Sequence, residues 1–82
     1  MLEYKFDVQL LIEGDNLDEN AISRTISQIP GDCLLCVGDE EMLKVHYHTN
    51  DPWDVLKVCA SFGDICDIVV ENMQRQAEGL NG

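Results

Sequence analysis

The pattern of apolar and polar positions along the chain predicts four strands and two helices. Strict alternation, as in Phe6, Val8, Leu10 and Ile12, is typical of half-buried strands, whereas apolar residues at helical spacing indicate helices. In chain order we expect a strand at 4–13, a helix at 18–29, strands at 33–37 and 42–49, a helix at 52–62 and a strand at 65–71.

Turn and capping residues predict where the two helices begin and end. Asn16 precedes Glu19 by three residues, the spacing of a capping box, so we expect it to begin the first helix. Asp51 and Pro52 are typical of the cap and first position of the second helix. Gly63 is expected to end that helix as its C-terminal glycine.

The order of these elements predicts a ferredoxin-like α+β fold, the βαββαβ two-layer sandwich, with an antiparallel sheet and both helices on one face. We expect the first and third strands to be central neighbours and to run parallel. One domain should cover residues 1–72, followed by a polar C-terminal tail at 73–82 that is frayed or helical and docks only through Met73.

Such a fold leaves one sheet face open, and both histidines of the chain lie on it. His46 and His48 are two residues apart on a strand, so they project to the same side. If the apolar positions of the first and third strands face the helices, Asp7 and Gln9 meet the histidines on the open face. This cluster suits a metal ion, a phosphate or a proton transfer; alternatively, the histidines are solvated surface residues.

Composition narrows the classes of partner and the compartment. Among 82 residues, 16 acids against 5 bases give a formal charge of −11, which disfavours nucleic acid and anionic lipid and favours cations or a basic protein surface. Without a membrane-spanning apolar run or a signal pattern, we expect a cytoplasmic protein. The sequence fits either a complete protein or a piece of a longer one.

The four cysteines, Cys33, Cys36, Cys59 and Cys66, are interpreted as small buried apolar residues. Cys33 and Cys36 have a CxxC spacing, but they lie within a predicted strand, where a separation of three places them on opposite faces. A shared metal or a redox pair would need a turn or a helix N-terminus instead.

Three stretches resemble a known family: Gly31–Asp39 (GDCLLCVGD), Leu43–Pro52 (LKVHYHTNDP) and Glu71–Gln76 (ENMQRQ). They are similar to the middle domain of the bacterial fatty-acid kinase ATP-binding subunit family. Members carry an N-terminal dihydroxyacetone-kinase-like (DAK2) domain and have been labelled DAK phosphatases. The resemblance extends from about residue 4 to residue 76, and its KVHxHT and ENMxxQ blocks are fairly specific.

The resemblance implies an assembly role and a zinc site rather than catalysis by this chain. The family's DAK2 domain, with its ATP-binding and magnesium-binding residues, has no counterpart in this sequence. In the family, two histidines matching His46 and His48 bind zinc together with a first-strand cysteine, and Asp7 stands where that cysteine is expected. A set of Asp7, His46 and His48 still suits zinc, iron(II) or manganese, with at least one coordination position open.

Cys33 and Asp67 are outside candidates for further ligands. An even-length hairpin loop would place Cys33 opposite His46, but aligning Leu35 and Val37 with the buried Val45 and Leu43 turns Cys33 into the core. Asp67, on the last strand, is expected to reach the open face beside Asp7.

Three functions remain open. The first is a non-catalytic accessory module of a fatty-acid-kinase-like system, whose open sheet face meets a protein partner or a second copy; candidate partners are a kinase domain and a fatty-acid-binding subunit. Leu11 and Trp53 are candidate contacts on such a module, although Trp53 equally suits packing on its own helix cap. The second is a small metal-dependent hydrolase with Asp67 or Glu71 as general base. The third is a metal-free interaction domain.

Overall fold

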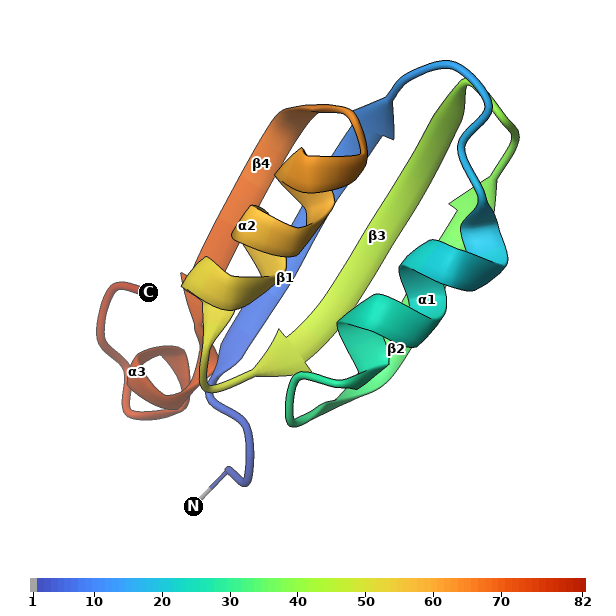
Figure 1. Cartoon of the computed structure of the whole chain (residues 1–82). Coiled ribbons are helices and arrows are strands. Elements are labelled where there is room, and N and C mark those ends of the chain that lie inside the picture. The colour runs from blue at the N-terminus through green and yellow to red at the C-terminus, as the bar shows by residue number, and fades with distance from the viewer. Residues whose placement is uncertain (1) are drawn as a thin grey trace.

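The computed structural model describes residues 2–82 and shows the predicted ferredoxin-like α+β sandwich (Figure 1). Its elements are β1 (Phe6–Glu13), α1 (Glu19–Ser27), β2 (Gly31–Gly38), β3 (Met42–Thr49), α2 (Pro52–Phe62), β4 (Asp64–Asn72) and α3 (Met73–Ala77). Helices α1 and α2 lie side by side over one face of the sheet, as the sequence predicted.

The strand order is β2-β3-β1-β4, and every neighbouring pair is antiparallel. The prediction that β1 and β3 are central neighbours is therefore confirmed, but the parallel orientation predicted for them is wrong. The crossover through α1 returns the chain so that β2 runs in the direction of β1. The hairpin between β2 and β3 then reverses it, which makes β3 antiparallel to β1.

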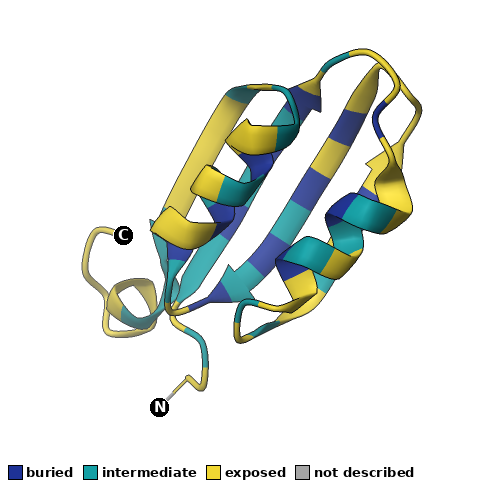
Figure 2. Ribbon diagram, in the orientation of Figure 1, coloured by how far each residue is buried: buried dark blue, intermediate teal, exposed yellow. Residues whose placement is uncertain are grey.

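The core lies between the helices and the inner face of the sheet, and β3 alternates between buried and more accessible positions (Figure 2). This confirms the predicted alternation, except that Phe6 is only half-buried. The buried apolar residues are Val8, Leu10, Ile12, Leu17, Ile22, Ile26, Cys36, Leu43, Val45, Tyr47, Val55 and Cys59. Burial on this face alone leaves the alternate positions of β1 and β3 on the opposite, open face.

Two predicted helix boundaries differ from the structure. The cap of α1 is Asp18, whose carboxylate accepts a hydrogen bond from the Ala21 amide at 3.1 Å, whereas Asn16 has a left-handed φ of 55° in the preceding turn. Gly63 follows α2 with an extended φ of −177°, so it is not a left-handed cap. Glycine is needed there because a Cβ would lie 2.5 Å from the Glu13 carbonyl oxygen.

Strand β2 departs most from the sequence-based prediction. Its pairing with β3 shifts between Asp32 and Leu35, so two residues of β2 stand where β3 has one, and Cys33 has a left-handed φ of 57°. This β-bulge reverses which side chains face inward. Leu35 and Val37, predicted to be buried, are 44% and 46% exposed on the open face.

The cysteines follow from the same shift. Cys33, expected in the core, is exposed, whereas Cys36 takes the inward position opposite Val45. Cys36 and Cys59 are buried, as predicted, and Cys66 is half-buried. The burial predicted for all four thiols is therefore wrong for Cys33 and only partly right for Cys66.

The chain ends beside its beginning (Figure 1). Asn72 caps α3 by accepting a hydrogen bond from the Arg75 amide at 3.0 Å, and the Met73 amide donates to the Lys5 carbonyl at 2.7 Å. The residues after β4 thus pack against the segment that precedes β1. None of the helices within residues 2–82 has the length and apolar character needed to cross a membrane.

Candidate functional site

The predicted cluster of Asp7, His46 and His48 lies on the open sheet face, at the junction of β1 and β3. Asp7 is directly opposite His48, and Gln9 is opposite His46, in an uninterrupted antiparallel register. Because the register has no bulge here, the alternation that buries Val8 and Tyr47 brings the four polar side chains together on the other face.

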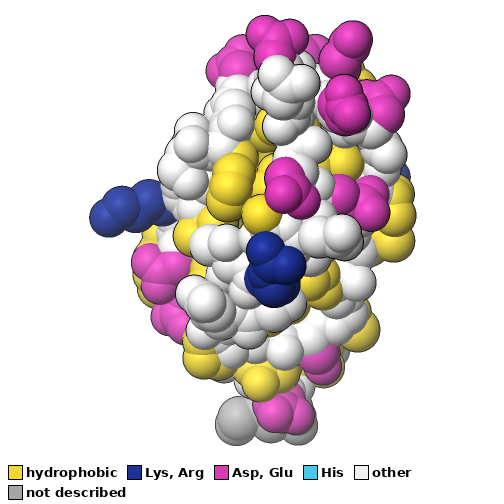
Figure 3. Space-filling model, turned by 45° about the vertical axis from the view of Figure 1, so that its right-hand side comes forward, with side chains coloured by type: hydrophobic (Ala, Val, Ile, Leu, Met, Phe, Trp, Pro, Cys, Tyr) yellow, Lys and Arg dark blue, Asp and Glu magenta, His cyan; other side chains and the backbone are white. Residues whose placement is uncertain are grey.

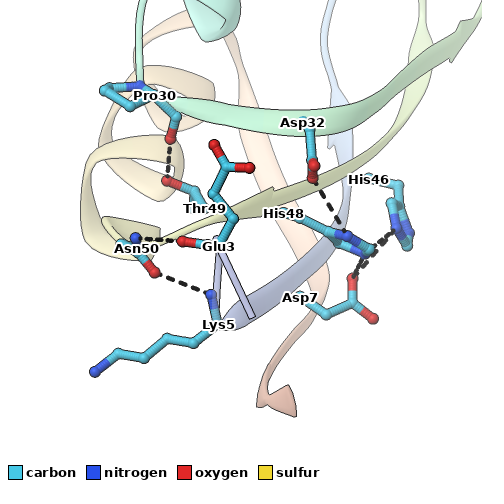
Figure 4. Close-up of polar contacts among 9 residues, drawn as sticks. All are labelled: Glu3, Lys5, Asp7, Pro30, Asp32, His46, His48, Thr49 and Asn50. Atoms are coloured by element: carbon cyan, nitrogen blue, oxygen red, sulfur yellow. Dashed lines mark hydrogen bonds and ion pairs between the residues drawn. The ribbon is translucent and has the colours of Figure 1, made fainter. Parts of the chain in front are cut away.

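The three side chains converge closely (Figure 4). The Nε2 atoms of His46 and His48 are 3.0 Å apart, and Oδ1 of Asp7 lies 3.4 Å and 3.7 Å from them, respectively. The side chains of His46, His48 and Asp7 are 26%, 24% and 17% exposed, so solvent reaches the cluster without flooding it. At this separation two imidazole lone pairs need a proton or a cation between them.

The carboxylate of Asp7 has one free oxygen. Its Oδ2 accepts a hydrogen bond from Nε2 of Gln9 at 3.2 Å, whereas Oδ1 is buried and has no hydrogen-bond partner. A buried carboxylate oxygen without a partner is costly, so such atoms usually have a ligand or a functional task. Here the free oxygen faces the two imidazoles.

These distances suit a tetrahedral metal ion. Ligand atoms about 2.0–2.2 Å from a tetrahedral zinc ion lie about 3.4 Å from one another. The three separations within the cluster, 3.0, 3.4 and 3.7 Å, lie on either side of that value. Asp7, His46 and His48 can therefore hold a divalent cation without rearranging the sheet.

A second group, which the sequence analysis did not identify as a set, adjoins the first. Oδ1 of Asp32 lies 3.7 Å from Nδ1 of His48, and Asp32, Cys33 and His48 offer ligand atoms within 4.8 Å of one another. Desolvation, followed by the charge and hydrogen bonding of Asp32, raises the pKa of the Cys33 thiol, which disfavours the thiolate that binds metals. Only the bulge of β2 decides that Asp32 faces His48, so no local signal in the sequence identifies it.

Asp67 does not lie beside Asp7 as predicted. The residue of β4 opposite Asp7 is Glu71, and a register shift between Gln9 and Leu11 gives Asp67 a left-handed φ of 49°. Asp67 instead borders a shallow hollow of about 280 Å³, together with Lys44 and Leu11. It is not among the residues that converge with the histidines.

Trp53 is on the surface, away from the cluster. It is 60% exposed, and its ring meets Phe6 edge to face with ring centroids 6.4 Å apart. Both residues border a broad groove of about 870 Å³ near the chain ends, which also includes Leu2, Lys5 and Gln74. Trp53 therefore packs on β1 while most of its ring stays accessible.

Acidic side chains crowd one end of the molecule in Figure 3, a view in which no histidine is visible. The turn after β1 and the β2–β3 turn lie side by side, because the Leu17 amide donates to the Glu40 carbonyl at 2.8 Å. Exposed acids in these two turns are Asp15, Asp18, Asp39, Glu40 and Glu41. The resulting field favours a cation over a phosphate as a ligand of the chain.

The fold and the cluster define a class: a ferredoxin-like α+β domain with a histidine–carboxylate cluster on its open sheet face. The family model for the FakA-like middle domain, a domain of fatty acid kinase, matches residues 3–80. The chain belongs to this family, as the sequence resemblance predicted.

Relatives of the chain are much longer proteins. Protein YloV of Bacillus subtilis is 33% identical over 79 residues, covering 92% of this chain and 14% of YloV. Uncharacterized proteins of Staphylococcus saprophyticus and Staphylococcus aureus are 42% and 41% identical over 59 residues, covering 72% of this chain and 10% and 11% of their own lengths. The chain thus spans 10–14% of the length of these relatives.

Proposed function

We propose that the chain is a non-catalytic accessory and assembly domain of a fatty-acid-kinase type system and that it binds one divalent metal ion, zinc first, through Asp7, His46 and His48. The observation that carries the metal site is the unpartnered Oδ1 of Asp7 facing two Nε2 atoms at ligand spacing. The accessory role rests on the match to a middle domain.

The metal would act by fixing the sheet and its open face. It would join β1 to β3 across their central pairing and neutralise the Asp7 carboxylate, which otherwise lacks a partner for one oxygen. Three protein ligands leave a fourth position for water or for a group from a partner. Zinc is favoured over iron(II) and manganese because two imidazoles and one carboxylate at tetrahedral spacing match its usual ligands.

The open face also offers apolar surface for a partner. Leu35, Val37 and Val69 are each more than 40% exposed on it, and Leu11 is half-buried between them and the hollow beside Lys44. We expect another protein surface to cover this face, from a kinase domain, a fatty-acid-binding subunit or a second copy of the chain. Sedimentation of the chain alone, compared with Leu35→Ser, tests self-association as the simplest of these.

A metal-dependent hydrolase is the competing function, since an open coordination position can activate water. Its predicted general bases are poorly placed: Asp67 borders a different hollow, and the Glu71 carboxylate accepts a hydrogen bond from Gln76. The assembly role is therefore the better supported of the two.

Elemental analysis of untagged protein tests the metal site. Wild type and Lys44→Ala, a control on the same strand and face, should carry about one zinc per chain, whereas His46→Ala/His48→Ala should carry none. Circular dichroism confirms that all three proteins are folded. Wild-type protein that stays metal-free after reconstitution with zinc, iron(II) and manganese would overturn the proposal.

A further inference from the structure

His48 differs from His46 in that both of its ring nitrogens face a polar group. Its Nε2 meets His46 and Asp7, whereas its Nδ1 lies 3.7 Å from Oδ1 of Asp32 (Figure 4). If Nε2 gives its lone pair to a metal ion, the proton of the neutral ring must lie on Nδ1. That N–H then points toward a carboxylate.

The bulge of β2 is what places Asp32 there. Asp32 pairs with His48 and so lies on the open face, and the extra residue that follows restores inward packing at Cys36. The extra residue requires a left-handed conformation at Cys33, which is unfavourable for any residue with a Cβ. Bulges beside functional sites commonly re-aim a side chain in this way.

We propose that Asp32 is a positioning residue, which accepts a hydrogen bond from Nδ1–H of His48 and so holds that ring in the orientation and tautomer that bind the metal. The proposal rests on the metal site proposed above. The present 3.7 Å separation is an ion-pair distance, longer than a hydrogen bond, and the 56% exposed carboxylate has room to close it. Carboxylate partners of metal-binding histidines act in this manner.

His46 provides an internal control for this role. Among the ion pairs of residues 2–82, none involves its Nδ1, and its neighbour on β2 is the apolar Leu35. The two metal-binding rings should therefore differ in how strongly their Nδ1–H groups are held. A purely structural role for Asp32 would not produce such a difference.

The experiment compares zinc affinity in Asp32→Ala, Asp32→Asn and Asp15→Ala by competition with a chromophoric chelator. Asp15→Ala removes the same charge from an exposed turn after the far end of β1 from the site. We expect Asp32→Ala to weaken binding about 10- to 100-fold, Asp32→Asn to recover part of the loss through its amide oxygen, and Asp15→Ala to match wild type. Metal-free unfolding midpoints should stay similar, because Asp32 is exposed.

NMR of the ¹⁵N-labelled imidazoles in the zinc-loaded protein provides the second readout. The Nδ1–H of His48 should exchange with water more slowly than that of His46, and Asp32→Ala should remove the difference. Equal affinity and equal exchange in wild type and Asp32→Ala would overturn the positioning role while leaving the metal site in place. Absence of zinc binding by wild type would overturn both proposals.

Cys33→Ser separates positioning from direct ligation by Asp32. If Asp7, His46 and His48 hold the metal, this variant should bind zinc as wild type does. Loss of zinc in both Cys33→Ser and Asp32→Ala, with binding retained in Asp7→Ala, would place the metal among Asp32, Cys33 and His48. That result would make Asp32 a ligand and overturn its positioning role.

Discussion

The two neighbours of β3 reach the same histidines by different means. On one side β1 pairs with β3 without interruption, so Asp7 falls opposite His48 by alternation alone. On the other side β2 reaches its partner through a bulge with a left-handed residue at Cys33. Regular pairing supplies the candidate ligand, and irregular pairing supplies the carboxylate behind it.

The difference shows how the strands divide two demands. The central strand β1 is held between β3 and β4, and a register slip there would expose its buried row of apolar residues. The edge strand β2 has one neighbour, so an extra residue disturbs less of the sheet. A bulge is therefore tolerated where it adjusts the site, and the ligand itself stays on the rigid strand.

The largest effect is expected on the regular side, at Asp7. Asp7→Ala should weaken zinc binding by about 100-fold or more, because it removes a ligand whose free oxygen faces both imidazoles. Asp7→Cys, which installs the cysteine expected from the family resemblance, should bind zinc at least as tightly as wild type. Isothermal titration or chelator competition measures both variants.

Metal-free unfolding is the control for Asp7→Ala. Because Oδ1 of Asp7 has no hydrogen-bond partner, its removal should leave the unfolding free energy of the metal-free protein unchanged or raise it by about 1 kcal/mol. Zinc affinity that survives Asp7→Ala would show that β1 does not contribute to the site.

A smaller effect is expected from the bulge, measured as stability. Cys33→Gly should stabilise the protein by about 1 kcal/mol, since glycine adopts a φ of 57° without the Cβ penalty. Leu35→Gly, at an exposed position of the same strand that pairs regularly with His46, should destabilise it by about 0.5–1 kcal/mol. Urea unfolding compares the two, and destabilisation by both would argue against a left-handed residue in β2.

The smallest effect is a pH dependence at the turn that joins β2 to β3. The carboxylate of Asp39 accepts hydrogen bonds from the Glu41 and Met42 amides, both at 2.9 Å, and these bonds lower its pKa. A lowered folded-state pKa stabilises the protein above the unfolded pKa of about 3.9, and this stabilisation is lost as the pH falls through the folded value.

Asp39→Ala should therefore lower the thermal unfolding midpoint at about pH 7, and its difference from wild type should shrink below about pH 3. The exposed side chain keeps the effect small. Glu40→Ala removes the same charge from the same turn without the two amide contacts. An equal, pH-independent shift in both variants would attribute the effect to net charge.

Much of the fold and the central site could be predicted from periodicity. The alternation in β1 and β3 identified which residues are buried and brought Asp7, His46 and His48 to one face. The errors arose where one residue changes the register: the bulges at Cys33 and Asp67 displaced predictions that assumed regular strands. The cap of α1 was misplaced because Asn16 and Asp18 are both good capping residues and stand two positions apart.

The amino-acid sequence by itself determined the order of the elements, the buried rows of β1 and β3, and the family, because these follow from local periodicity and from residue blocks that stand in the chain. Tertiary structure decided the antiparallel direction of β3, the exposure of Cys33 and the approach of Asp32 to Nδ1 of His48. These depend on how one strand registers against another. That register is fixed by the packing of the whole sheet against its helices, not by any short stretch of sequence.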